Sequence, residues 1–167
     1  MIPRTLLTSL NYKKLISLSG LFFRRPLMVI PTIIATKNCI RISDHYFPNL
    51  HHLNNSSNAF RHALWNILLT KEAYQWNKDF NEALQWAKTI TDWHEEFSPN
   101  KPLERAMDLH NNAYGRTFVH KMFKRNNIIE TDSEKLAKEL LPFLTTSKKV
   151  SNLNELRTLK NQLVHLI

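Results

Sequence analysis

Glycine and cysteine are scarce in this sequence, which has only two glycines and one cysteine among its 167 residues. Phosphate-binding loops of the Walker and dinucleotide types need several glycines, because glycine lets backbone amides approach a phosphate closely. We therefore exclude both loop types. A lone cysteine, Cys39, cannot form an internal disulfide, a zinc knuckle or a redox pair. The fold consequently does not depend on an oxidising compartment.

Acidic residues are absent from residues 1–43, which contain seven lysines and arginines, while the whole chain has a net charge of +9. The rest of the chain is nearly neutral and lacks the basic surface that tracks nucleic-acid phosphates, so we expect no sequence-specific nucleic-acid binding. The basic segment fits three alternatives: an integral helix of the fold with a solvated face, a targeting segment, or contact with an anionic membrane surface.

Long hydrophobic runs are also absent. The uncharged run at residues 26–36 has eleven residues, against roughly 20 needed to cross a bilayer, so no transmembrane helix is predicted. Residues 15–23 follow two lysines as in a signal peptide, but two arginines interrupt the pattern and no small-x-small cleavage site follows. We predict no conventional signal peptide, and export by a non-classical route stays open.

Apolar residues recur at intervals of three and four over most of the chain, the spacing of amphipathic helices. We predict an all-α fold: a single compact domain of about five to seven helices, with a basic N-terminal arm at residues 1–44 and a helical body at residues 45–167. Residues 27–34 are predicted as helix, with a short edge strand as the alternative. Residues 45–58 are rich in Asn, Ser and Pro, which predicts a loop.

Helix-starting residues mark where five helices of the body are expected to begin. The third of these helices should be about 20 residues long, and the last should cover residues 153–164. The starting residues are Ser57 or Asn58, Asp79, Pro102, the pair Thr131 and Glu134, and Ser151.

Three of the predicted helices each carry a histidine on their apolar face: His62, His94 and His110. A single histidine in such a place is usually a hydrogen-bonded core residue. Three histidines among carboxylates and amides are harder to explain in this way, because each buried unsatisfied polar group costs about 1–3 kcal/mol. We expect the three helices to bring these groups into one polar network.

Imidazole and carboxylate are the ligands expected for a divalent metal such as zinc or manganese. We expect His62, His94, Asp108 and His110 to hold the ion and Glu95 to accept a proton from an attacking water. A buried network without metal, which fixes helix packing, is the alternative. The other candidate catalytic residues are Arg61, Asn66, Asn111, Asn112 and Arg116.

Gly115 interrupts a predicted helix, where glycine costs about 1 kcal/mol relative to alanine. This cost suggests that another backbone, a bulky side chain or a substrate comes close at that position. Arg116, next to it, could offer two donors to a phosphate or carboxylate, or pair with Asp108 or Glu104.

The segments NAFRHALWN, TDWHEEF and MDLHNNAYGR resemble the signature blocks of a poorly characterised bacterial domain family with secreted and toxin-like members. That family's blocks read Ala-Phe-Arg-His-Ala-x-Trp-Asn, His-Glu and Met-Asp-Leu-His-Asn-Asn-x-x-Gly-Arg. Asn58 stands where the family commonly has aspartate, so an acidic role there is lost or taken over by another group. The resemblance implies a site made of Arg61, His62, Asn66, His94, Glu95, Asp108, His110, Asn111, Asn112 and Arg116.

A looser similarity is to the HD superfamily of helical metal phosphohydrolases, whose ligands run His, then His-Asp, then Asp. His62, His94 with Glu95, and Asp108 follow that order with glutamate in place of aspartate. Our leading hypothesis is a metal-assisted hydrolase acting on a small-molecule or lipid substrate, such as a phosphoester, a lipid or a cell-envelope component. The alternative is a non-enzymatic binding or toxin-delivery module. No oligomeric state is predicted.

Overall fold

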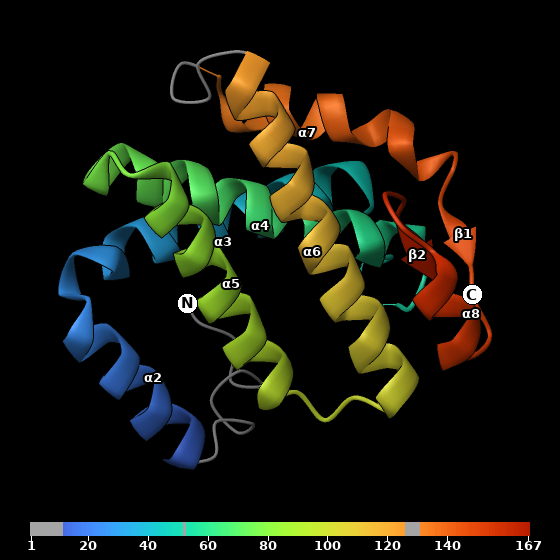
Figure 1. Cartoon of the computed structure of the whole chain (residues 1–167), viewed down its shortest axis with the longest axis horizontal. Coiled ribbons are helices and arrows are strands. Elements are labelled where there is room, and N and C mark those ends of the chain that lie inside the picture. Colours follow the sequence, from blue (N-terminus) through green and yellow to red (C-terminus); the bar gives the residue numbers. More distant parts are fainter. Residues whose placement is uncertain (1–11, 52, 126–130) are drawn as a thin grey trace.

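α-Helices form most of the computed structural model, which describes residues 12–51, 53–125 and 131–167 (Figure 1). This confirms the predicted all-α class. The first eleven residues of the basic arm lie outside the described residues. The α-helices are α2 (Tyr12–Arg24), α3 (Val29–Tyr46), α4 (Ser56–Asn77), α5 (Phe80–Glu96), α6 (Pro102–Arg125), α7 (Ser133–Leu140) and α8 (Leu153–Thr158). Two 3-10 helices, η1 (Pro26–Met28) and η2 (Leu141–Leu144), and two short parallel strands, β1 (Lys148–Lys149) and β2 (Val164–His165), complete the described part.

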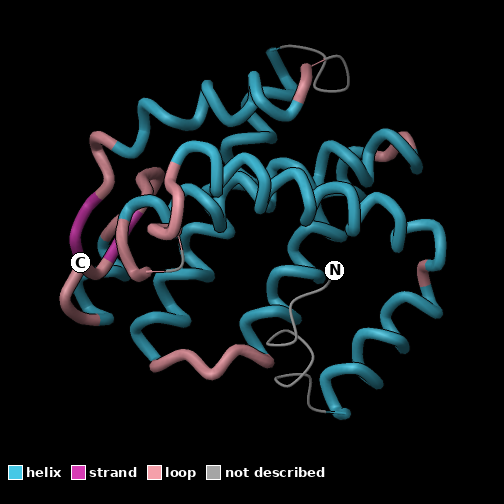
Figure 2. Tube along the Cα trace, turned by 180° about the vertical axis from the view of Figure 1, so that it is seen from behind, coloured by secondary structure: helices cyan, strands magenta, loops and turns pink. Residues whose placement is uncertain are grey.

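Helix α4 is the centre of the fold and packs against α3, α5 and α6 (Figures 1 and 2). It is buried on nearly every side, as expected for a helix without a continuous polar face. Phe60, Leu64 and Ile67 fill the core around it. His62 and Asn66 are buried on the same helix, so α4 carries polar groups into the interior, where they need partners from its neighbours.

Helices α4 and α6 are in tight contact at Ala63 and Gly115. The space that a side chain on residue 115 would occupy is filled by the backbone of Ala63. The sequence predicts that another backbone, a bulky side chain or a substrate lies close to Gly115, and in the structure the neighbour is another backbone. This contact sets the distance between the polar residues of α4 and those of α6.

The predicted helix starts are partly right. Asp79 caps α5 by accepting a hydrogen bond from the amide of Glu82, and Pro102 is the first residue of α6, as expected. The predicted start of α4 was wrong, because the cap is Asn55, whose side chain accepts a hydrogen bond from the amide of Asn58. Helix α3 continues to Tyr46, into the segment that was predicted as a loop. Extended backbone angles at Asn55 suit it to that role.

Two further boundaries correct the prediction. Asp132, rather than Thr131, caps α7. The last predicted helix, residues 153–164, ends at Thr158 because the backbone is extended at Leu159 and left-handed at Asn161. Leu163 and Val164 are still buried, but they lie in or next to a short strand.

Residues 27–34 are helical, as favoured by the sequence, and Pro31 lies in the first turn of α3. Proline is tolerated there because amides of the first turn have no partner within the helix. No single helix in the described ranges has the length and apolarity needed to cross a membrane. Helix α2 and residues 26–46 meet those criteria only as a pair, and they are bent by 110° relative to each other.

Candidate metal centre

Three helices bring one histidine and two carboxylates together in the interior: His62 of α4, Glu95 of α5 and Asp108 of α6. Nδ1 of His62 lies 3.6 Å from Oε1 of Glu95, and its Nε2 lies 3.3 Å from Oδ1 of Asp108. All three residues are buried, and one potential ligand atom from each lies within 4.8 Å of the other two. We call these three residues the HED cluster.

The protonation of His62 follows from its neighbours. Arg61 donates a hydrogen bond from Nη2 to Nε2 of His62 at 3.1 Å, and a guanidinium has no acceptor, so Nε2 bears a lone pair. The proton of the neutral ring then sits on Nδ1, which donates to Oδ1 of Asn112 at 3.3 Å. Nε2 of His62 and Oδ1 of Asp108, 3.3 Å apart, are therefore two hydrogen-bond acceptors in contact with each other.

This contact leaves buried polar atoms without partners. Among the described residues, Oδ1 of Asp108 and Oε2 of Glu95 have no hydrogen-bond partner. The other oxygen of each carboxylate is bonded, since Asn100 donates to Asp108 at 2.8 Å and Asn112 donates to Glu95 at 3.4 Å. The lone pair of Nε2 and Oδ1 of Asp108 thus face each other without a proton between them, and Oε2 of Glu95, nearby in the same cluster, lacks a partner among the described residues. A proton or a cation would relieve this conflict.

The electrostatics agree with this reading. Burial raises the pKa of Glu95 to about 7. Burial, and then the nearby charge of Glu95, raise the pKa of Asp108 to about 7. Burial, followed by the charges of Arg61 and His94, holds the pKa of His62 well below its usual value. His62 is therefore neutral near pH 7, the form that binds metals.

A second layer of polar side chains holds the HED cluster in place. Oδ1 of Asn112 also accepts from Asn66 at 2.8 Å, and Arg116 donates to Oδ1 of Asn66 at 2.7 Å. Thr91 donates to the same oxygen at 3.3 Å. These bonds join α4, α5 and α6 and fix the orientation of the amide that touches both His62 and Glu95.

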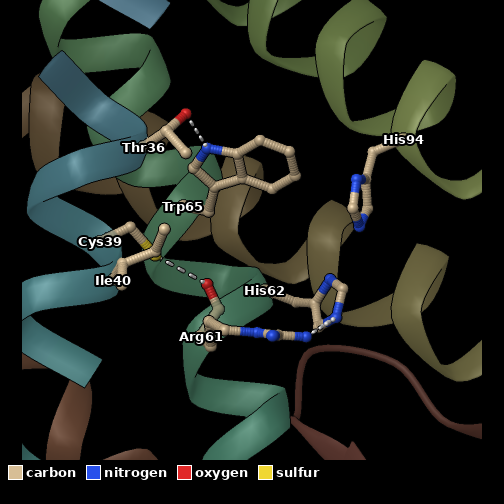
Figure 3. A pocket seen from close by; sticks show the side chains of 7 residues that line it. All are labelled: Thr36, Cys39, Ile40, Arg61, His62, Trp65 and His94. Carbon is tan, nitrogen blue, oxygen red and sulfur yellow. Dashed lines mark hydrogen bonds between the residues drawn. The ribbon is translucent and has the colours of Figure 1, made fainter. Parts of the chain in front are cut away.

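A small cavity of about 130 Å³ adjoins the cluster on the side of α3 (Figure 3). His62, Arg61 and His94 supply its polar side chains, and the ring of Trp65 lies between His94 and Thr36 of α3, to which its Nε1 donates at 3.0 Å. The ring of His94 packs edge-on against Trp65, with 5.2 Å between ring centroids. Burial, then the charges of Lys14 and Arg61, lower the pKa of His94 to about 4. The α3 side is formed by Thr36, Cys39 and Ile40.

Not all predicted site residues meet at the HED cluster. His94 lines the cavity instead of joining the cluster, and Glu95, expected to accept a proton, belongs to the potential ligand group. Nε2 of His110 donates to the backbone oxygen of Gln162 at 2.9 Å, away from the other histidines. Asn111 exchanges two hydrogen bonds with the backbone of Val164.

Sequence reasoning missed several residues of this site. Asn100, in the connection between α5 and α6, orients Asp108, and Thr91 supports Asn66. Thr36, Cys39 and Ile40 were assigned to the basic arm, although they line the cavity. Periodicity does place Thr91 on the apolar face of its helix together with His94, but it gives Thr91 no role in the site, and no sequence signal links Asn100 or α3 to the histidines.

The fold and the HED cluster together define a helical domain with one histidine held between two buried carboxylates. A family model described as a domain of unknown function, DUF6973, matches residues 19–147, and the chain belongs to this family. The matched region begins within α2, ends three residues after η2 and contains the whole HED cluster. No curated protein and no solved structure matches the chain.

Proposed function

We propose that this protein is a metal-assisted hydrolase in which His62, Glu95 and Asp108 hold a divalent cation such as zinc or manganese. The observation that carries the proposal is the contact between Nε2 of His62 and Oδ1 of Asp108, 3.3 Å apart in a buried site. Two facing acceptors repel each other, whereas a cation between them would attract both. Oε2 of Glu95, which has no hydrogen-bond partner among the described residues, would supply the third ligand.

The composition of the cluster suits a catalytic ion more than a structural one. One nitrogen and two oxygen ligands leave coordination positions for water and substrate, as in catalytic zinc sites. Ligands about 2.1 Å from a tetrahedral ion lie about 3.4 Å apart, so a cluster whose ligand atoms span up to 4.8 Å would contract on binding. Arg61 would also have to leave Nε2 of His62 and turn into the cavity that it already lines.

The residues around the cavity would then take distinct chemical roles. A bound cation would supply a hydroxide by lowering the pKa of a coordinated water. His94, which is neutral near pH 7 and faces the cavity, would accept the proton. Arg61 would stabilise negative charge on the substrate oxygen. In this assignment His94 takes the role that the sequence gave to Glu95.

The cavity supports a substrate with a small apolar group. Its volume of about 130 Å³ is close to that of engineered apolar cavities of about 150 Å³ that bind benzene. Trp65, Ile40 and Cys39 offer it an apolar surface. The substrate would be a phosphoester or a carboxylic ester with a short apolar chain, from a small molecule or a lipid. With this chain in the cavity, the ester bond to be hydrolysed would lie at the polar side chains. A toxin-like effector role would be compatible with such chemistry.

The test begins with metal content. Protein purified without chelator is analysed for metals, and binding of Zn²⁺ and Mn²⁺ to chelator-treated protein is measured by calorimetry. We expect one ion per chain in the wild type and a loss of affinity of about 100-fold or more in His62→Ala. His110→Ala is the matched control, because His110 lies on the same helix as Asp108 but outside the cluster, and it should bind like the wild type. Equal affinity in all three proteins would contradict the proposal.

Activity is then assayed with p-nitrophenyl phosphate and with short p-nitrophenyl esters, with and without added metal. Hydrolysis that requires the metal and is lost in His62→Ala supports the proposal.

The second candidate function is a binding or toxin-delivery module without chemistry. The bonds among Asn66, Asn112, Arg116 and Thr91 favour it, because they join three helices and would stabilise packing by themselves. This alternative predicts no stoichiometric metal and a sharply lower melting temperature in Asn112→Ala, since the amides left behind would be buried without partners.

A further inference from the structure

The outer face of α3 exposes a row of isoleucines. Ile30, Ile33 and Ile40 are 53%, 47% and 49% exposed, and Ile34 lies beside them. Their spacing of three and four residues places them on one side of the helix. Buried residues such as Ala35 and Ile42 occupy the opposite side, against α4. The row is therefore an apolar surface that no described part of the chain covers.

The row continues past the start of α3. Leu27 in η1 is 69% exposed, and Phe23 near the end of α2 is 89% exposed. Soluble proteins rarely expose so many large apolar side chains in one region unless the region binds something. We call the surface formed by Leu27, Ile30, Ile33, Ile34, Lys37 and Ile40 the α3 face.

Positive charge accompanies the α3 face. Lys37 lies within the row of isoleucines, and Arg24 lies at the end of α2. In the part of the chain that the structure describes, neither residue forms an ion pair. Arg25 and Arg41 are paired with Glu82 and Glu134 at its margins. No acidic residue occurs before Asp44, so nothing in residues 1–43 repels an anionic partner.

We propose that the α3 face binds the surface of an anionic lipid bilayer, with its isoleucines in the interfacial region and its cations at the lipid phosphates. Helices with an apolar side and flanking lysine or arginine lie in membranes in this way. A second copy of the chain fits less well, because a two-fold contact through the α3 face would place Lys37 of one copy near Lys37 of the other. An acidic protein could match the charge, but the continuous apolar row favours lipid.

The position of α3 connects this surface to the cavity. Thr36 and Ile40 line the cavity beside His62, and Ile40 also belongs to the α3 face (Figure 3). A bilayer bound at this face would therefore lie beside the α3 side of the cavity. If the proposed hydrolase activity holds, this arrangement favours a lipid substrate; this last step rests on the proposed function, whereas binding to the bilayer does not.

Co-sedimentation of the full chain with vesicles tests the proposal. Vesicles of phosphatidylcholine alone are compared with vesicles that contain about 30% phosphatidylglycerol. We expect binding to the anionic vesicles that weakens with salt. Replacing Ile30, Ile33 and Ile34 together by serine should weaken it at least about tenfold. Lys37→Glu should reduce binding to anionic vesicles and leave any binding to neutral vesicles unchanged.

A matched control removes exposed apolar side chains elsewhere. Phe143 is 41% and Leu153 is 36% exposed, and both lie outside α2 and α3. Replacing both by serine should leave vesicle binding unchanged, and circular dichroism checks that every variant is folded. The proposal is overturned if the wild type ignores anionic vesicles or if the triple-serine variant binds them as well as the wild type does. A wild-type dimer in light scattering that the triple-serine variant converts to a monomer would assign the α3 face to a second copy.

Because binding is measured without substrate, its outcome is independent of the hydrolase. An inactive His62→Ala protein should still bind vesicles like the wild type. A protein that binds metal and hydrolyses soluble esters but ignores vesicles would overturn only the membrane proposal.

Discussion

A Cβ atom built on Gly115 would lie 2.3 Å from the carbonyl oxygen of Ala63 and 2.8 Å from its Cα. Both distances are far inside van der Waals contact, and both partners are backbone atoms that cannot turn away. Glycine at this position lets α6 approach α4 closely enough for Nε2 of His62 to reach Asp108 at 3.3 Å. The site therefore depends on a residue that has no side chain.

Substituting the two glycines separately tests this relationship. Gly115→Ala should lower the free energy of unfolding by about 2–4 kcal/mol, because the two helices must separate. Gly20→Ala is the matched control: residue 20 lies within α2 with nothing within 4 Å of the added Cβ. We expect it to leave stability unchanged or to raise it by up to about 1 kcal/mol. Urea unfolding measures both, and similar effects of the two changes would contradict the close contact.

Stability without metal should depend on pH through Asp108. Burial raises the pKa of this carboxyl from 3.8 to about 7. The folded state thus holds a proton that the unfolded chain releases at lower pH, so this contribution is complete below about pH 4 and is lost as the pH rises through about 7. Asp108→Asn removes the ionisation, and relative to the wild type it should gain roughly 2–4 kcal/mol between pH 5 and pH 8.

Unfolding in urea with chelator, at both pH values, measures the difference. Asp92→Asn is the control, since Asp92 is partly exposed and pairs with Lys88 across one helical turn. It should change stability by less than about 1 kcal/mol at either pH. An Asp108→Asn protein whose stability parallels that of the wild type across this range would show that the carboxyl ionises freely in the folded state.

Neighbouring asparagines on α6 should behave differently. The side-chain amide of Asn111 donates from Nδ2 to the backbone oxygen of Val164 at 2.9 Å and accepts at Oδ1 from the backbone amide of Val164 at 3.0 Å. Asn111→Ala should lower stability by about 1–3 kcal/mol, because it leaves buried backbone groups of β2 unpaired. Metal affinity should not change. Asn112 contacts His62 and Glu95, so Asn112→Ala should weaken metal binding by about 10–100-fold. Calorimetry and urea unfolding distinguish the two, and equal effects on affinity would contradict the placement of Asn111.

Periodicity in the sequence was sufficient to predict the helical class and the inward position of His62, because both depend on which residues share a helix face. The partners of His62 could not be predicted in the same way. His62 and Asp108 are 46 positions apart in the chain, and their contact depends on how two helices cross. His110 extends the apolar stripe of α6 just as expected, yet the turn after α8 brings the carbonyl of Gln162 to it instead of another histidine.

The charge pattern was similarly informative only in part. The absence of acidic residues from residues 1–43 is visible in the sequence, but the exposure of Ile33 and Ile40 on α3 is not. In α3, the buried side and the exposed side both contain apolar residues spaced three and four apart, so the spacing does not distinguish them. Only the packing of α3 against α4 shows which side remains open.

His94 gives the sharpest test of the proposed chemistry. It lines the cavity but does not belong to the HED cluster, so His94→Ala should retain the metal and the fold and lose most of the hydrolysis, by about 100-fold or more. His110→Ala is again the matched control and should retain full activity. Activity retained in the folded His94→Ala protein would remove His94 from the mechanism.

The pH profile separates the ligands from the base. In the proposed site a metal would compete with protons for Glu95 and Asp108, because burial raises the pKa of each carboxyl to about 7. At low metal concentration, activity should therefore fall as the pH drops below about 7. Higher metal concentration should move this fall to lower pH, because the cation displaces the protons. The shift can continue only until the metal-bound hydroxide or His94, with a pKa of about 4, becomes protonated. Metal affinity measured by calorimetry is not limited in this way, so an affinity that is equal at pH 5 and pH 8 would show that no metal competes with these protons.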